Sequence, residues 1–157
     1  MGSTFVIHCK NIIHGNLSSN NVLIDSHHTV RLTDYGLSSV VSTCGDLFQS
    51  YHCGALRWTP PELISDDDQE AGNVSSCYSD IYSFGCVVFH VLSGKLPYWW
   101  LDDVLRVVSA RHKGVDPLGP GTEMDGGYVK FVQRCLSVSP TDRPTIDQIK
   151  AFVARSM

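Results

Sequence analysis

Hydrophobic positions near the start of the chain follow a strand-like pattern. Val22–Ile24 and Val30–Leu32 are short runs of β-branched and apolar residues, and the polar segment DSHHT separates them. Short runs of this kind around a polar turn are typical of a β-hairpin. The sequence therefore predicts a small hairpin over residues 22–32, and it predicts the end of a helix at residues 3–9.

The pattern becomes helical from Tyr78 onward. Apolar residues recur there at steps of three and four, at Ile81, Phe84, Val88, Val91 and Leu92. Gly94 is placed to end this helix, and Pro97 lies just beyond it. The helix is apolar nearly all round, so we expect it at the centre of the fold.

Three further helices are predicted after the central one. Asp102 or Asp103 is placed to begin the first, which has apolar residues at 104, 105, 107 and 108 and a stop at Gly114. Residues 128–136 form the second. The last begins with a capping box, in which the Thr145 hydroxyl and the Gln148 side chain satisfy free backbone N–H groups. Its inward-facing residues are Ile146, Ile149, Phe152 and Val153.

Composition and charge fit one globular domain. The 157 residues are 43% hydrophobic and 18% charged, which is enough to bury a core. The net charge of −4 comes without clustered Lys and Arg, so we expect no nucleic-acid or membrane-surface partner. The longest apolar run, residues 81–92, is too short to span a bilayer, and the start of the chain shows no targeting signal. We expect a soluble intracellular protein in the cytoplasm.

The cysteines and histidines do not form a recognisable metal or disulfide pattern. Six cysteines are scattered without a CxxC pair, and the seven histidines show no second pair at ligand spacing. Cys86 and Cys135 lie in apolar helical patterns, where cysteine usually acts as a small hydrophobic residue. We therefore expect neither disulfides nor a zinc site.

Five short motifs occur in an order that is typical of one family. His14-Gly15-Asn16-Leu17 with Asn21 resembles the catalytic loop H-R-D-L-x-x-x-N of protein kinases. Downstream of it, DYG at 34–36 resembles D-F-G, PPE at 60–62 resembles A-P-E, SDIYSFG at 79–85 resembles the central helix of the C-terminal lobe, and DRP at 142–144 resembles the turn before the last helix. Together these motifs resemble the protein kinase superfamily.

The resemblance implies a protein kinase-like fold, and specifically its C-terminal lobe over residues 1–157, mainly α-helical with a small β-hairpin. The segments GALRWTPPEL and LPYWW are similar to those of the tyrosine-kinase-like group. The glycine-rich loop G-x-G-x-x-G and the V-A-I-K strand belong to the N-terminal lobe, and this chain contains neither. We therefore expect a partial kinase domain without that lobe.

By the same resemblance, four residues hold the scaffold. Glu62 is expected to pair with Arg143, which would join the activation segment to the helical core. Asp80 is expected to accept hydrogen bonds from the backbone around His14. These roles concern the fold and do not imply activity.

The positions that would carry the chemistry depart from the kinase pattern. The catalytic carboxylate is replaced by Asn16, and the Lys that steadies the transferred phosphate in serine/threonine kinases is replaced by Ser18. Gly15 replaces the Arg that receives an activation-loop phosphate in many kinases, and Ala55 stands where a Thr is expected. The catalytic loop is therefore of the pseudokinase type.

Two positions that would hold magnesium keep the family residues. Asn21 and Asp34 match the ligands of the Mg²⁺ ions that bridge the phosphates of ATP. One interpretation is that they bind ATP and Mg²⁺ without turnover. The other is that they cap the loop backbone and bind nothing, since the rest of the nucleotide site is missing. The sequence leaves both open.

Three functional hypotheses follow from these residues. The first is a pseudokinase lobe that acts as an interaction or allosteric signalling module through protein partners. The second is a fragment of a divergent, active serine/threonine protein kinase that tolerates Asn16. The third is the kinase-homology regulatory domain of a receptor guanylate cyclase, in which HGNL and TDYGL also occur. Four departures around a single loop favour the first.

Overall fold

The computed structural model describes residues 12–35, 55–64 and 75–156. Within these ranges the α-helices are α3 (Cys77–Ser93), α4 (Val104–His112), α5 (Gly126–Cys135) and α6 (Ile146–Arg155). Strands β1 (Val22–Ile24) and β2 (Val30–Leu32) form the hairpin, and short 3-10 helices lie at η1 (Ser19–Asn21), η3 (Ala55–Arg57), η4 (Pro61–Leu63) and η5 (Pro140–Asp142). This arrangement confirms the expected mainly helical fold with a small hairpin. The helix predicted at residues 3–9 lies outside the described residues.

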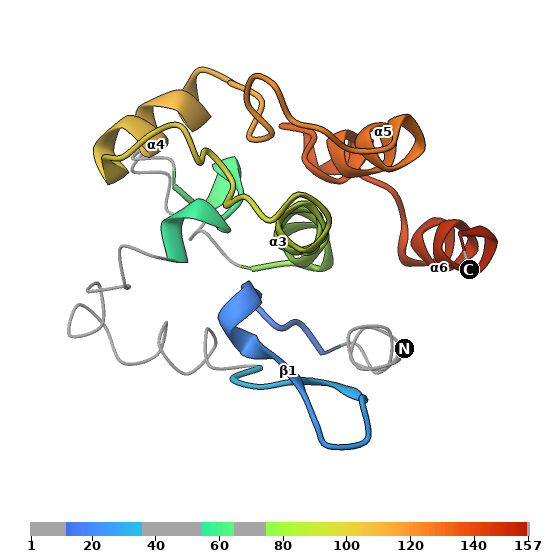
Figure 1. The fold of residues 1–157 in the computed structure, drawn as a ribbon. Coiled ribbons are helices and arrows are strands. Elements are labelled where there is room, and N and C mark those ends of the chain that lie inside the picture. Colours follow the sequence, from blue (N-terminus) through green and yellow to red (C-terminus); the bar gives the residue numbers. More distant parts are fainter. Residues whose placement is uncertain (1–11, 36–54, 65–74, 157) are drawn as a thin grey trace.

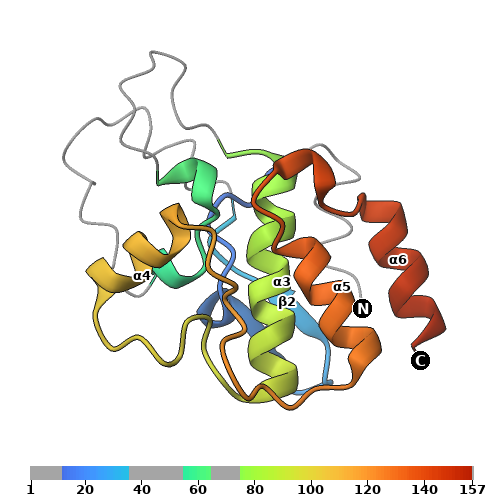
Figure 2. The same cartoon turned by 90° about the horizontal axis from the view of Figure 1, so that it is seen from above.

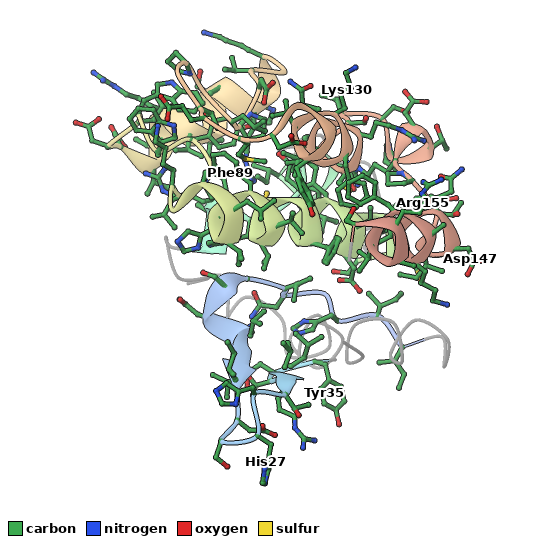
Figure 3. The ribbon with its side chains drawn as sticks, turned by 45° about the vertical axis from the view of Figure 1, so that its right-hand side comes forward. His27, Tyr35, Phe89, Lys130, Asp147 and Arg155 are labelled. Carbon is green, nitrogen blue, oxygen red and sulfur yellow. The ribbon has the colours of Figure 1, made fainter. Side chains whose placement is uncertain are left out.

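Helix α3 lies at the centre of the molecule, as its apolar pattern predicts. Figure 1 looks along α3, with α4 and α5 above it and the hairpin below it. Ser76 begins the helix by exchanging hydrogen bonds with Ser79, and Gly94 ends it with a φ of +69°. That positive φ suits glycine, because a side chain would be strained there. Its inward residues include Ile81, Cys86 and Phe89, each at most 4% exposed. Figure 3 shows Phe89 on this helix.

Helix α5 packs against α3, and α6 lies on the outer side of α5 (Figure 2). Gly85 allows α3 and α5 to approach each other closely, because a Cβ atom at this position would lie 2.6 Å from the Cβ of Cys135. The rings of Phe131 and Phe152 stack at 4.0 Å and join α5 to α6. Burial raises the pKa of the Cys135 thiol to about 12, so it behaves as a packed hydrophobic residue, as predicted.

The hairpin is antiparallel, with Val22 opposite Leu32 and Ile24 opposite Val30. Asp25 shapes its turn, because its carboxylate accepts the backbone N–H groups of His27 and Thr29 at 2.9 Å. His27 marks the tip in Figure 3, on the side of α3 opposite to α5. The hairpin thus extends directly from the loop that carries the candidate catalytic residues.

Two details of the helices differ from the prediction. Helix α5 begins at Gly126, two residues before the expected start at 128, because the Asp125 side chain accepts the N–H of Gly127 and caps it. In α4, Leu105 is 76% exposed although it belongs to the apolar set, whereas Val107 is fully buried. Helix α4 therefore buries only one narrow face.

No helix within the described ranges combines the length and apolar content that a membrane span requires.

Candidate functional site

The loop His14–Asn21 is fixed from below by one buried carboxylate. Asp80, on the first turn of α3, accepts the backbone N–H of His14 at 2.7 Å and that of Gly15 at 2.8 Å. Asp80 is only 2% exposed, so these charge-assisted hydrogen bonds are shielded from water. Gly15 has a φ of +74°, which favours glycine. The structure therefore places Asp80 and His14 in the contact that the resemblance implies.

His14 is completely buried under this loop. Its Nδ1 accepts the backbone N–H of Asn16 at 3.3 Å, which assigns the proton of the neutral ring to Nε2. Among the described residues, Nε2 has no hydrogen-bond partner. Burial lowers the pKa of His14, and the nearby carboxylate of Asp80 acts in the opposite direction. His14 is thus held as a neutral, packed side chain.

Asn16 stands at the position of the missing carboxylate and is partly exposed. Its backbone carbonyl accepts a hydrogen bond from the side-chain Nδ2 of Asn21 at 2.8 Å. Ser18 is buried, and its carbonyl accepts the backbone N–H of Asn21 at 3.1 Å. Because Asn16 and Ser18 are both neutral, neither can offer the charge that phosphoryl transfer uses.

Asn21 and Asp34 lie at the same end of the hairpin. The backbone N–H of Thr33 bonds the carbonyl of Asn21 at 3.0 Å, which continues the register of β1 and β2 by one step. Asp34 follows directly, is exposed, and has a φ of +59°. Asp tolerates this left-handed conformation better than most residues. Figure 3 shows the adjacent Tyr35 on the hairpin side of α3.

These two side chains carry the oxygen donors that Mg²⁺ prefers. The amide nitrogen of Asn21 is used on the carbonyl of Asn16, and its Oδ1 accepts no hydrogen bond within the described residues. In the same residues, His, Cys, Asp and Glu side chains do not gather in any group of three or more. Asn21 and Asp34 are therefore candidate Mg²⁺ ligands, and within the described residues they are not part of an all-protein metal cluster.

Glu62 and Arg143 form a bidentate ion pair. Nη1 and Nη2 of Arg143 donate to Oε1 and Oε2 of Glu62 at 2.6 and 2.7 Å. The Arg143 side chain is fully buried, whereas that of Glu62 is 28% exposed. Arg143 also donates to the backbone carbonyls of Tyr78 and Ser137, at 2.9 Å each. One arginine thus joins η4, α3 and the turn after α5.

Two arginines that the sequence analysis did not single out hold the segment between η3 and η4. Arg57 donates to the carbonyls of Pro97, Tyr98 and Leu101 at 3.0, 2.8 and 2.6 Å. Arg111 of α4 donates to the carbonyls of Arg57 and Thr59. The sequence did contain a signal that Arg111 lies on the buried face of α4, because it follows Val107 by four residues.

Comparison with known proteins identifies similar sequences over nearly the whole chain. A family model described as protein kinase domain matches residues 4–152. The chain is 33% identical over 147 residues to mitogen-activated protein kinase kinase kinase 3 of Arabidopsis thaliana, covering 91% of this chain and 24% of that protein. It is 31% identical over 152 residues to kinase suppressor of Ras A of Caenorhabditis elegans, covering 91% of this chain and 20% of that protein.

A third similar protein is serine/threonine-protein kinase STY17 of Arabidopsis thaliana, which is 29% identical over 143 residues, covering 91% of this chain and 24% of that protein. The chain spans between 9% and 24% of the length of five curated relatives that it matches. The similarity therefore concerns one domain of much longer proteins.

Proposed function

Because this chain belongs to the protein kinase domain family, we propose that it is a kinase-like signalling domain in which phosphoryl transfer is impaired. The observation that carries this proposal is Asn16, which stands where the family resemblance implies a catalytic carboxylate. A neutral amide neither accepts a proton at physiological pH nor supplies negative charge. A positioned general base is worth about 10²- to 10⁴-fold in rate, so its loss lowers turnover strongly.

The neighbouring replacements act in the same direction. Ser18 removes the positive charge that would face the transferred phosphate, and Gly15 removes the arginine that would receive an activation-loop phosphate. Both residues lie within two positions of Asn16, while the contacts of Asp80 with the loop backbone are intact. This distribution supports a loop that keeps its shape without the charges of an efficient kinase.

In place of catalysis, the domain acts through protein partners as an interaction or allosteric module of the tyrosine-kinase-like, pseudokinase type. Support comes from the ion pair of Glu62 with Arg143 and from the buried Asp80, which give the lobe a rigid frame. A rigid surface lowers the ordering cost of binding a partner, because fewer side chains have to be immobilised.

Nucleotide binding belongs to the proposal as a retained property. Asn21 and Asp34 would hold Mg²⁺ and, through it, the phosphates of ATP. The competing interpretation is that Asn21 only caps the carbonyl of Asn16, a hydrogen bond that the structure contains. The two interpretations differ in whether the Asn21 Oδ1 and the Asp34 carboxylate bind Mg²⁺.

Two readouts on the same protein test the proposal. The unfolding midpoint is measured with and without ATP and Mg²⁺, because a ligand at 100 times its dissociation constant adds about 2.7 kcal/mol to stability. Release of ADP is measured in the same mixture. We expect an increase in Tm that Asp34→Ala removes, together with ADP release no faster than in that variant. ADP release at about 1 to 100 s⁻¹ that Asp34→Ala abolishes would contradict the proposal.

An active serine/threonine protein kinase is the second candidate. The retained pair Asn21 and Asp34 favours it, and so does the similarity to serine/threonine-protein kinase STY17. It requires that water or another side chain replaces the base at Asn16. The same ADP measurement separates the two candidates, because only this one predicts fast turnover that depends on Asp34.

A further inference from the structure

A cavity lies on the far side of the lobe from the hairpin, between η4, α4, the turn after α4 and the end of α5. Its volume is about 280 Å³, which is close to the lower limit for small-molecule pockets. Tyr82, Tyr98 and Arg111 contribute to its wall from the core. Val115 and Val138 contribute from the two turns. The cavity therefore suits a small ligand with an apolar body.

Arg111 brings a buried positive charge to this wall. The residue is 2% exposed, and its guanidinium carbon lies 5.6 Å from the ring centre of Tyr82 and 5.3 Å from that of Tyr98. Its two terminal nitrogens donate to the backbone carbonyls of Arg57 and Thr59. Within the described residues its Nε has no hydrogen-bond partner.

No carboxylate among the residues that the structure describes forms an ion pair with Arg111. The other buried arginine, Arg143, lies 5.1 Å from the same Tyr82 ring and does have a carboxylate, that of Glu62. A buried charge without a counter-ion is several kcal/mol less favourable than a paired one. Carbonyl dipoles and aromatic faces offset only part of this energy. Within the part of the chain that the structure describes, Arg111 thus lacks the carboxylate partner that Arg143 has.

The charge at the rim of the cavity limits which anion fits. The exposed carboxylate of Asp116 also lines the cavity, where it accepts hydrogen bonds from Gln133 Nε2 and from the N–H of Leu118, both at 2.9 Å. Asp116 would repel a ligand with two negative charges more strongly than a ligand with one. A monoanionic carboxylate is therefore favoured over a phosphate dianion.

From the cavity, from Arg111 without a carboxylate partner among the described residues, and from the apolar side chains of Val115 and Val138, we propose that this pocket binds a small organic carboxylate with an apolar body. The carboxylate pairs with Arg111, and the body packs against Val115, Val138 and the tyrosine rings. The pocket is separate from the catalytic loop and does not depend on the proposed function.

Benzoate and benzamide are suitable probes, since they have the same shape and differ in charge. Each is titrated into the full 157-residue chain, and binding is followed by nuclear magnetic resonance of the Arg111 Nε–H and of nearby backbone amides. We expect saturable benzoate binding that is at least about tenfold tighter than benzamide binding. Phenyl phosphate should bind more weakly than benzoate.

Variants locate the binding. Val138→Trp places a large ring at the pocket rim and should weaken benzoate binding at least about tenfold. Val91→Trp is the matched control, because Val91 is exposed on α3 and does not line the pocket. Arg111→Gln should abolish the preference for benzoate over benzamide. If that variant does not fold, the comparison of Val138→Trp with Val91→Trp tests the proposal.

Three results would overturn the inference. The first is the absence of saturable benzoate binding up to about 50 mM. The second is equal binding of benzoate and benzamide, or tighter binding of phenyl phosphate. The third is unchanged benzoate binding in Val138→Trp.

Discussion

The scaffold below the catalytic loop and the upper face of that loop differ in how they place charge. In the scaffold, which comprises Asp80, Glu62 and Arg143, the charged groups are buried or half-buried and form short hydrogen bonds with defined partners. On the loop face, Asn16 has replaced an expected carboxylate, and the retained carboxylate of Asp34 is exposed. The fold and the chemistry of a kinase domain therefore depend on separate groups of residues.

Under the proposed function, this difference explains how a kinase fold can persist without efficient turnover. A change in the scaffold leaves a buried charge or N–H without a partner, and that destabilises the whole lobe. A change from Asp to Asn on the loop face affects ligand binding or the transition state of a reaction, and it leaves the buried contacts of the scaffold in place. Equivalent changes in the two regions should therefore differ in their effect on stability.

Removing Arg143 should have the largest effect on stability. Arg143→Ala leaves the half-buried carboxylate of Glu62 without its partner and should lower the free energy of unfolding by about 3 to 5 kcal/mol. Urea denaturation measures the change. Arg106→Ala is the control, because the Arg106 side chain is 70% exposed in its ion pair with Asp102 and should contribute less than about 1 kcal/mol. Equal losses in the two variants would contradict the assigned role of Arg143.

Two aspartates permit the same change in each region. Asp80→Asn keeps one acceptor oxygen for the N–H groups of His14 and Gly15, removes the charge, and should cost about 1.5 to 3 kcal/mol. Asp34→Asn changes an exposed side chain and should alter the free energy of unfolding by less than about 0.5 kcal/mol. Thermal and urea unfolding of both variants provide the comparison. A larger loss in Asp34→Asn would show that this carboxylate belongs to the scaffold.

The buried imidazole of His14 should make stability depend on pH. Its pKa is lowered by burial from an ordinary value of 6.5, so between the two values the unfolded chain binds more protons than the folded one. The free energy of unfolding should therefore be unaffected by this group above pH 6.5 and should fall as the pH decreases below 6.5. The decrease due to His14 should be at most about 1.4 kcal/mol per pH unit.

Urea midpoints at several pH values measure this slope. His14→Asn retains an oxygen that can accept the N–H of Asn16 and should reduce the slope below pH 6.5. His27→Asn changes an exposed histidine at the hairpin tip and should leave the slope as it is. An unchanged slope in His14→Asn would show that other groups cause the acid sensitivity.

Asn16→Asp should also have only a small effect on stability. The side chain is partly exposed, and its backbone carbonyl would still accept the hydrogen bond from Asn21. We expect a change of less than about 1 kcal/mol in the free energy of unfolding by urea. A loss above about 2 kcal/mol would mean that the neutral amide is itself required by the fold.

Much of the fold was predictable because it depends on local spacing. The steps of three and four in α3 located that helix to within one residue, and the capping box of Thr145 and Gln148 located α6. Helix α5 was misplaced by two residues, since its first residues are Gly126 and Gly127, which are poor helix formers, and the Asp125 cap compensates for them.

The contacts of the site required more than spacing. The family resemblance, and not the local pattern, pointed to the contact of Asp80 with the loop 65 residues earlier and to the pairing of Glu62 with Arg143. Neither the family resemblance nor the local pattern indicated that Arg111 would reach the carbonyls of Arg57 and Thr59, because that contact depends on how α4 docks on a distant segment. Long-range placement of single polar groups is therefore where the sequence was least informative.

The most direct test of the account is transfer of the γ-phosphate of ATP to a generic protein substrate. Wild-type protein, Asp34→Ala and Asn16→Asp are assayed side by side with Mg²⁺. We predict that wild type and Asp34→Ala give the same background, because the group at position 16 cannot act as a base. Transfer by wild type at about 1 to 100 s⁻¹, abolished by Asp34→Ala, would contradict it.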